Sequence, residues 1–395
     1  MEHIAIIKAL SRAALSGSSR EVATHQIDRL VTALRKSGDP DAEALAKIAE
    51  TSASPRKAAP SRVARSVAPN LERMKPGAPV PVDPESAAPL ATLVFPAENP
   101  ANAPIFGSDV EDVVRSLTRE WQHQEELFAA GLRPSLTALA YGPPGTGKTT
   151  LALWFAKQLQ LPAVVVRLDG LISSLLGTTA RNLGALFDFA NRYDCVLILD
   201  EFDAIAKVRD DPNEVGEIKR VVNALLQNMD GRASTGITIG LTNHESLLDP
   251  AVWRRFEVQI PIPLPGLGQR GEIVANSLRG ADIVESESKL IGWLTEGMSG
   301  AEVTTVCEKW RKQWIVDANL NATPADVIVQ AVSTTAARFG NTGVARYRNP
   351  DTLLLALAKG NEAHFGQAEL AHLFKVSTKT VSRRLSEIQS EEAHA

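Results

Sequence analysis

Cysteine is nearly absent from this sequence of 395 residues, which contains only Cys195 and Cys307. Two cysteines so far apart along the chain are too few for a disulfide framework or a zinc site. Cys195 lies in an apolar run, where packing is the simpler interpretation and a redox role the alternative. The cysteine content therefore excludes the class of small, disulfide-stapled secreted proteins.

A large charge of one sign and long hydrophobic runs are also missing. The formal net charge is −4, so no overall field attracts nucleic acid or an anionic membrane, and any DNA contact must be local. Lys8 and Arg12 interrupt the apolar residues at the start of the chain, which argues against a signal peptide or a membrane span. We therefore expect a cytoplasmic protein without membrane contact.

Hydrophobic residues make up 44% of the chain, enough for sizeable cores in two or three folded units. Apolar spacing and composition divide the chain into five segments. These are a helical N-terminal module (1–50), a flexible Pro/Ala-rich linker (51–92), an α/β domain (93–265), a helical region (266–340) and a helical C-terminal module (350–390).

Short apolar runs alternate with helical patterns in the α/β segment. This alternation predicts a doubly wound parallel sheet with helices on both faces. The expected strands are Leu136–Tyr141, Ala163–Leu168, Cys195–Leu199, Ile237–Thr242 and Glu257–Ile260.

A glycine-rich run stands between the first of these strands and a helical pattern, which is the setting that a phosphate-binding loop requires. It consists of Gly142, Pro143, Pro144, Gly145, Thr146, Gly147, Lys148, Thr149 and Thr150. Glycines let backbone N–H groups turn toward phosphates, Lys148 can reach the terminal phosphates, and Thr149 can bind Mg²⁺. The full pattern favours an ATP site over a plain glycine turn.

Polar residues follow two later strands, where open α/β sheets bind ligands. Asp200 is suited to the Mg²⁺ shell, and Glu201 to orienting and polarising the attacking water. Asp203 could be a third catalytic acid, but a helix cap is the simpler interpretation. Asn243 could be a turn former, yet its place in this series predicts that it holds the water and the γ-phosphate.

Arg254 and Arg255 come after the strand that precedes Asn243, away from their own phosphate loop. Such arginines can act in trans, as fingers that stabilise the transition state in an adjacent subunit. The alternative is a solvated helix end whose dipole is complemented by cations.

These motifs resemble the AAA+ superfamily, and the AAA clade in particular. The runs GPPGTGKTT, LILDEFDAI, LTNHESLLDPAVWRRF and GMSGAEV have that clade's order and spacing over roughly residues 105–335. The resemblance implies a P-loop NTPase core with a helical lid, assembled as a ring that is usually a hexamer. It also implies that Gly142–Thr150 form Walker A, Asp200 and Glu201 Walker B, Asn243 sensor 1, Arg254 and Arg255 the fingers, and that Gly300 and Ala301 lie near the base and ribose.

One segment departs from the clade. Leu175, Leu176 and Gly177 match the central pore loop of members that thread polypeptides, but Leu175 replaces the usual aromatic residue. Thr178 and Ala180 replace the acidic residues that commonly follow the glycine. Threading is therefore not established by the sequence. The N-terminal helices, the Pro/Ala-rich linker and the segment DEFDAIAKVRDD are also similar to those of bacterial stand-alone AAA ATPases that accompany subtilisin-type proteases in phage defence.

The C-terminal residues 367–388 have the apolar spacing of a helix-turn-helix, with Lys375 where a turn glycine is common. Lys379, Arg383 and Arg384 on its second helix could contact DNA. The alternative is a helical cap that contacts a protein partner or a neighbouring subunit, since one short basic helix is a small electrostatic footprint. His372 is expected at the surface.

Three functions are consistent with these features. The first is a ring ATPase that remodels a protein partner. A separately encoded protease is one candidate partner, because no protease triad motif or nuclease metal cluster is recognisable in the chain itself. The second is an ATP-controlled DNA-binding assembly, and the third a nucleotide-sensing scaffold that uses ATP turnover as a timer.

Overall fold

The computed structural model describes residues 71–169, 176–204, 215–232, 236–316, 322–338, 343–360 and 363–394. All of them belong to one unit of the chain, Ser66–Ala395. The module predicted for residues 1–50 and the first part of the predicted linker lie outside the described residues. None of the described helices is long and apolar enough to cross a membrane.

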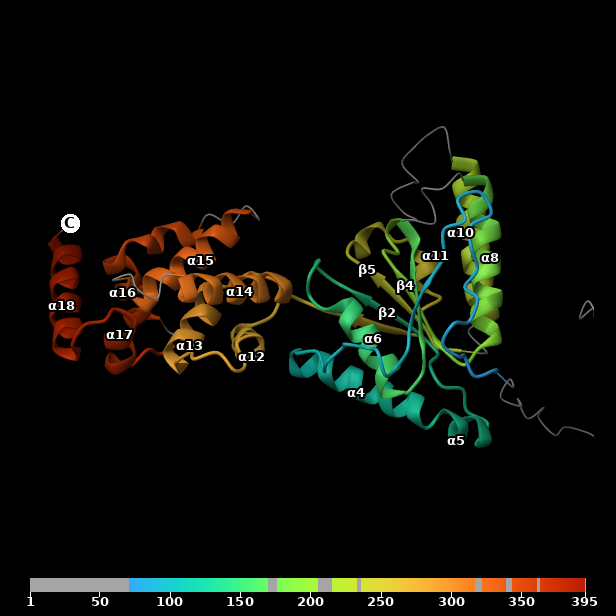
Figure 1. The fold of residues 1–395 in the computed structure, drawn as a ribbon, viewed down its shortest axis with the longest axis horizontal. Coiled ribbons are helices and arrows are strands. Elements are labelled where there is room, and N and C mark those ends of the chain that lie inside the picture. Colours follow the sequence, from blue (N-terminus) through green and yellow to red (C-terminus); the bar gives the residue numbers. More distant parts are fainter. Residues whose placement is uncertain are drawn as a thin grey trace, which may run out of the picture. The chain divides into compact units, whose positions relative to one another are not determined.

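A six-stranded sheet lies at the centre of the α/β domain (Figure 1). Its order is β1-β3-β4-β5-β2-β6, and every pairing is parallel except that of β1 with β3. The strands are β1 (Thr92–Val94), β2 (Thr137–Tyr141), β3 (Ala163–Arg167), β4 (Val196–Asp200), β5 (Thr238–Thr242) and β6 (Val258–Pro261). The five strands expected from the sequence are confirmed to within one residue at either end. The antiparallel edge strand β1 was not expected, because so short a strand has no periodicity to detect.

Helices cover both faces of this sheet. They are α4 (Ser108–Gln122), α5 (Gln124–Ala129), α6 (Lys148–Gln158), α8 (Leu176–Arg192), α10 (Val215–Arg232) and α11 (Pro250–Trp253). Val196 and Ile198 of β4 pack in the cluster that contains α4 and α6, whereas Leu197 and Leu199 pack with α8 and α10. Figure 1 shows these two pairs of helices beside the sheet. Because both faces are buried, the strands are continuous apolar runs, as in other parallel sheets. The predicted α/β fold class is confirmed.

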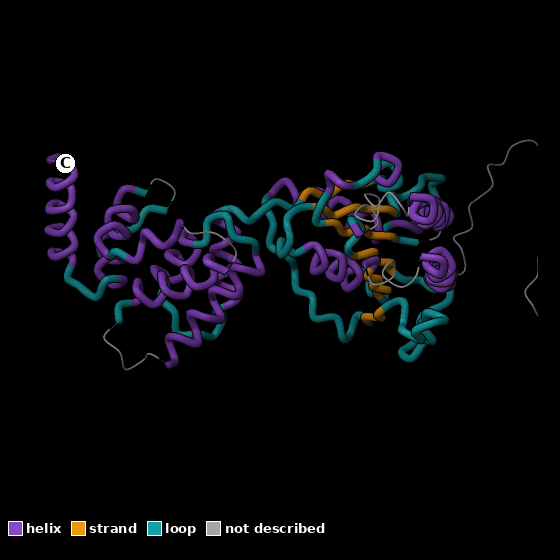
Figure 2. Tube along the Cα trace, turned by 90° about the horizontal axis from the view of Figure 1, so that it is seen from above, coloured by secondary structure: helices purple, strands orange, loops and turns teal. Residues whose placement is uncertain are grey.

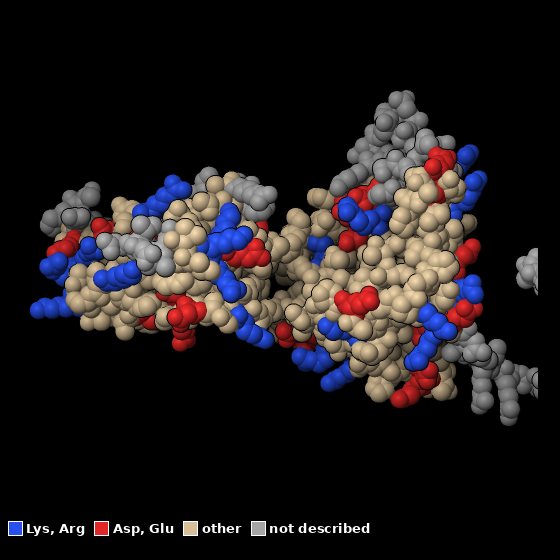
Figure 3. Space-filling model, viewed as in Figure 1, with Lys and Arg blue, Asp and Glu red and all other residues tan. Residues whose placement is uncertain are grey.

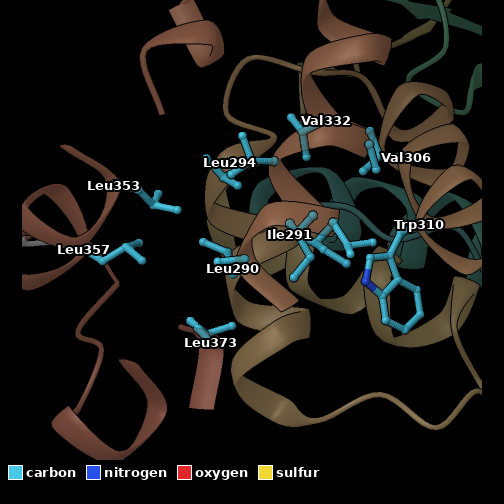
Figure 4. Packing of buried hydrophobic residues seen from close by; sticks show 14 of the residues in the cluster. Leu290, Ile291, Leu294, Val306, Trp310, Val332, Leu353, Leu357 and Leu373 are labelled. Carbon is cyan, nitrogen blue, oxygen red and sulfur yellow. The ribbon is translucent and has the colours of Figure 1, made fainter. Parts of the chain in front are cut away.

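After Pro261 the described chain is entirely helical or irregular (Figure 2). The α-helices are α12 (Leu267–Ser277), α13 (Glu285–Leu294), α14 (Gly300–Val316), α15 (Pro324–Arg338), α16 (Pro350–Lys359), α17 (Gln367–Leu373) and α18 (Thr378–His394). The described chain also has two 3₁₀ helices, η3 (Gly343–Arg348) in this region and η2 (Glu245–Leu247) in the α/β domain. One hydrophobic cluster includes Leu290, Trp310, Leu353 and Leu373 (Figure 4). The segments expected at 266–340 and 350–390 therefore share a core, and their division into two modules stays a prediction.

The described part of the linker expected at 51–92 packs on the α/β core and does not stand free. Met74, Leu90 and Ala91 are buried in the cluster that contains α8. Asp83 accepts hydrogen bonds from the backbone N–H of Ser86 (2.8 Å) and from Asn182 Nδ2 of α8 (2.5 Å). A few apolar side chains and one buried carboxylate are enough to dock this segment, although its composition resembles that of a tether.

Gly240 of β5 allows a large ring to pack against the sheet, and its replacement tests this packing. A Cβ there would lie 2.6 Å from Phe256 Cζ, and Phe256 is buried against Phe202. We expect Gly240→Ala to lower the free energy of unfolding by about 1–3 kcal/mol, as overpacking does. The measurement is urea unfolding, with Gly184→Ala as the control because a Cβ at Gly184 of α8 meets nothing within 4 Å. Equal midpoints for the two variants would contradict the packing argument.

Candidate functional site

The loop between β2 and α6 is shaped by three glycines in left-handed backbone conformations. Gly142, Gly145 and Gly147 have φ values of +144°, +75° and +99°. A Cβ on Gly142 would lie 2.1 Å from the carbonyl oxygen of Ile262, and one on Gly145 would lie 2.7 Å from Ser299 Oγ. Only glycine fits these positions, so the loop can form a concave surface of backbone groups at the start of α6.

Lys148 is the first residue of α6, and its side chain is folded against this loop. Its Nζ donates hydrogen bonds to the carbonyl oxygens of Gly142 and Pro143, each at 2.7 Å, and the residue is buried. Burial lowers the pKa of Lys148, while the negative charges of Asp200, Asp203 and Glu245 oppose that shift. Lys148 makes no ion pair with a carboxylate among the described residues, and a buried cation of this kind is suited to pairing with a bound anion.

Thr149 and Asp200 meet at the carboxyl end of β4. Thr149 Oγ1 donates a hydrogen bond to Asp200 Oδ2 at 3.1 Å. These are hard oxygen ligands, which Mg²⁺ prefers, so the pair fits a magnesium ion that is otherwise coordinated by phosphate and water oxygens. The described residues contain no group of three or more His, Cys, Asp or Glu side chains that could hold a metal without such a ligand.

Glu201 follows directly and has an unusual backbone conformation, with φ at +55°. For a residue with a side chain this conformation costs roughly 1–2 kcal/mol. Arg167 Nη2 lies 3.6 Å from Glu201 Oε1 and 2.9 Å from Asp169 Oδ2. Burial, a hydrogen bond to Asp169 and the charge of Asp169 raise the pKa of Glu201, and Arg167 opposes them.

Arg167 and Asp169 were not identified from the sequence. They lie at the end of β3, which pairs with β4 so that Arg167 stands opposite Asp200. The available signal was their position after an apolar strand, the same signal that identified Asp200 and Asn243. Arg167 and Asp169 were missed because only the order of strands in the sheet shows that β3 is the neighbour of β4.

Asn243 follows β5 and is connected to the turn after β4 by Asp203. The buried Asp203 Oδ1 accepts hydrogen bonds from Thr242 Oγ1 (3.2 Å) and from the backbone N–H of Asn243 (3.4 Å). This carboxylate therefore joins the ends of β4 and β5. The helix that Asp203 was expected to cap would include residues 205–214, which lie outside the described residues.

A cleft of about 1050 Å³ brings most of these residues together. Its wall contains residues 144–150, Asp200, Glu201 and Asn243, together with Gly300 and Ala301 at the start of α14. The backbone N–H of Ala301 donates to the carbonyl oxygen of Gly145 at 3.0 Å. Gly142 and Pro143 lie behind the wall, where their carbonyls hold Lys148. The sequence analysis missed the apolar part of the wall, formed by Ile105, Phe106 and Ile273.

Arg254 and Arg255 do not line this cleft. Arg255 forms an ion pair with Asp230 of α10, and Arg254 is exposed at the end of α11. The structure therefore does not bring the two arginines to the nucleotide cleft of their own chain. Leu175 of the expected pore loop lies outside the described residues, and Leu176 and Gly177 form the first turn of α8.

The expected helix-turn-helix corresponds to α17 and α18. Lys375, at the turn, has φ +49°, so this position is left-handed although it is not a glycine. Lys379 and Arg383 are exposed, and Arg384 is half-buried. His372 is partly exposed, and its Nε2 lies 3.1 Å from Oε1 of the buried Glu287. Acidic and basic side chains are mixed over the visible face of both the α/β and the helical parts (Figure 3).

A mostly parallel sheet, a glycine loop with a buried lysine after β2, and carboxylates at the end of β4 define a P-loop nucleotide-binding fold. Residues 138–264 match the family described as ATPase family associated with various cellular activities (AAA). The chain is 37% identical over 240 residues to an uncharacterized AAA family ATPase, y4kL, of Sinorhizobium fredii. The matched region covers 61% of this chain and 72% of the relative. The chain belongs to the AAA family of ATPases.

Two solved AAA domains are similar to this chain. The FIGL-1 AAA domain has a TM-score of 0.51 and 23% identity, over 62% of this chain and 85% of that chain. The FIGL-1 AAA domain in complex with ADP has a TM-score of 0.47 and 24% identity, over 63% and 92% of the two chains. At 23% identity, the similarity to the first of these structures shows a shared fold.

The charges around Glu201 lead to a prediction about its pKa. Replacing Asp169 with Asn removes a negative charge and its hydrogen bond, so the pKa of Glu201 should fall, whereas Arg167→Met should raise it because a nearby cation is lost. The measurement is a pH titration of the Glu201 carboxyl ¹³C shift in nucleotide-free protein. Shifts in the same direction for the two variants would contradict the arrangement described here.

Proposed function

We propose that this ATPase hydrolyses ATP in the cleft between the glycine loop and α14, with Mg²⁺ as cofactor. The observation that carries the proposal is that Lys148 at the start of α6, Asp200 and Glu201 at the end of β4, and Asn243 after β5 converge on one cleft. In this proposal Gly142–Thr150 hold the phosphates, and Lys148 pairs with the terminal ones.

The remaining residues of the cleft have complementary roles in the proposed reaction. Thr149 and Asp200 would hold Mg²⁺, which when bound neutralises developing phosphate charge. Glu201 would orient and polarise the attacking water, and Asn243 would fix that water and the γ-phosphate. Gly300 and Ala301, with the apolar side chains Ile105 and Phe106, would enclose the base and ribose.

We also propose that the chain assembles into a ring, with a hexamer as the expected size, and that Arg254 and Arg255 complete the cleft of the adjacent subunit. Neither arginine lines the cleft of its own chain, and this supports the interpretation. Phosphoryl transfer depends mainly on positioning and on charge stabilisation, so a cation supplied from outside can control the rate. Specific activity should then depend on assembly and rise with protein concentration.

We propose that ATP hydrolysis drives the remodelling of a protein partner in the cytoplasm. A separately encoded protease is among the candidate partners. The hydrogen bond from Ala301 to Gly145 connects the nucleotide loop to α14, and α14 shares its hydrophobic core with α17 and α18. A change in the nucleotide can therefore be transmitted to the C-terminal helices through packed elements.

The first test separates ATP binding from hydrolysis. We expect Lys148→Ala to abolish ATP binding, because it removes the cation inside the loop, whereas Glu201→Gln should bind ATP but hydrolyse it very slowly, because the phosphate cradle stays intact. Binding is measured with a fluorescent ATP analogue and turnover by phosphate release. Lys312→Ala is the control, since Lys312 is exposed on α14 and does not line the cleft. Wild-type ATP affinity in the Lys148 variant would refute the assignment.

A second candidate function is an ATP-controlled DNA-binding assembly that uses residues 367–388. It is favoured by the tight left-handed turn at Lys375, where the backbone N–H of Val376 donates to the carbonyl oxygen of Ala371, and by the exposure of Lys379 and Arg383. The pairing of Arg383 with Glu387 (3.6 Å) and the mixed surface charge weigh against it.

If this second function holds, the full chain should bind random-sequence duplex DNA weakly, with an affinity that falls steeply as salt increases, because phosphate contacts release counterions. The double variant Lys379→Glu, Arg383→Glu should lose that binding, and the control pair Arg115→Glu, Lys312→Glu should keep it. Fluorescence anisotropy at several salt concentrations is the measurement. No binding at about 50 mM salt would assign the module to protein contacts.

A further inference from the structure

The last turn of α14 exposes consecutive large apolar side chains. Trp314, Ile315 and Val316 are 36%, 68% and 79% exposed. The other large apolar side chains that are exposed in the described part of the chain occur singly along the sequence, as is ordinary for a protein surface. A contiguous apolar group at the surface marks an interaction site instead.

This apolar group lies on a well-packed base. The ring of Trp314 stacks on that of Trp310, with the centroids 5.7 Å apart and the planes 15° from parallel. Trp310 is itself buried in the cluster that contains Leu290. A partner can therefore bind here without first having to order the surface, which lowers the entropic cost of binding.

Exposed cations stand beside the apolar residues. Arg311 and Lys312 precede Ile315 and Val316 by four residues each, so they share a face of α14 with them. Both cations are exposed, and neither side chain forms an ion pair or hydrogen bond with another residue in the described part of the chain. Glu308 is the acidic neighbour one turn earlier, and it leaves this face with a net positive charge.

We propose that this end of α14, consisting of Arg311, Lys312, Trp314, Ile315 and Val316, is a docking site for an acidic amphipathic helix of a protein partner. The inference rests on the proposed remodelling function for the role of that partner. An amphipathic helix can cover the apolar side chains with its own and place carboxylates beside the two cations at the same spacing. Charge complementarity selects an acidic occupant, because a basic segment would be repelled.

The position of the docking site relates it to the nucleotide cleft. The same helix begins at the cleft, where the backbone N–H of Ala301 donates to the carbonyl oxygen of Gly145 at 3.0 Å and Thr304 lines the wall. From Ala301 to Ile315 the helix rises about 20 Å. A partner docked at this end would thus sit on an element that contacts the nucleotide loop directly.

A designed peptide tests the docking on the full chain without nucleotide. The probe is a fluorescein-labelled helix of about twenty residues, with leucines on one face and glutamates elsewhere. The control peptide has the same composition in an order that leaves no apolar face. By fluorescence anisotropy we expect the first peptide to bind and the second to bind roughly tenfold more weakly, since only the first can bury its leucines together. Binding should weaken as salt increases, because the charges are exposed.

Paired substitutions locate the site. Ile315→Ser with Val316→Ser should weaken binding about tenfold by removing apolar contact. Arg311→Glu with Lys312→Glu should weaken it by about as much, because attraction becomes repulsion.

The matched control is Leu132→Ser with Arg133→Glu. Leu132, 58% exposed, stands next to an exposed arginine after α5, and this pair should leave binding unchanged. All three double variants should keep the thermal unfolding midpoint of the wild type, since the substituted side chains are exposed.

The outcomes separate this inference from the function on which it rests. No saturable binding at about 1 mM peptide, equal binding of the control peptide, or an equal loss in the Leu132 and Arg133 variant would overturn the docking site. Binding to phosphatidylglycerol vesicles without peptide binding would assign the surface to membranes, and loss of self-association in the Ile315 and Val316 variant without peptide binding would assign it to a second copy; both overturn the proposal. A chain that binds the peptide but hydrolyses no ATP would refute the proposed function alone.

Discussion

The parallel register of β2, β4 and β5 is the constraint on which the rest of this structure depends. Hydrogen bonding between these strands places their carboxyl ends at one edge of the sheet, with Tyr141 opposite Thr242. The phosphate loop, Asp200 and Asn243 each leave the sheet at that edge, so one set of backbone pairings assembles a site from segments far apart in sequence. Burial of both faces fixes this register, because a slip of one residue would exchange the side chains of the two cores.

The site itself contains features that oppose stability. Lys148 is buried against carbonyl groups, Glu201 adopts a left-handed backbone, and its carboxyl is paired with Asp169 although both groups are acidic. Strain and buried charge of this kind persist only where the surrounding packing maintains them. The cost is consistent with a site that is arranged for a bound anion and a metal ion.

The contact between the glycine loop and α14 joins the α/β part of the described chain to the helical part at the cleft. Ser299 and Ala301 approach Gly145 so closely that no side chain fits there. Behind α14, Lys289 of α13 pairs with Glu369 of α17 at 3.1 Å, and Glu287 pairs with His372. The C-terminal helices are therefore packed against α13, and α13 packs against α12 and α14, which border the cleft. These contacts give binding energy at the cleft a physical route to a distant surface.

The sequence by itself determined the five strands β2 to β6, the glycine loop and the polar residues at the ends of β4 and β5. These features depend on local periodicity and on residue types that few other conformations require. It did not determine which strands are neighbours, so Arg167 and Asp169 beside Glu201, and Ile105 and Phe106 in the cleft wall, were found only in the folded chain. The docking of residues 71–92 and the pairing of Asp230 with Arg255 were likewise decided by tertiary structure. Such contacts join segments whose separation along the chain leaves no local pattern to detect, and only the packing of the sheet and its helices brings them together.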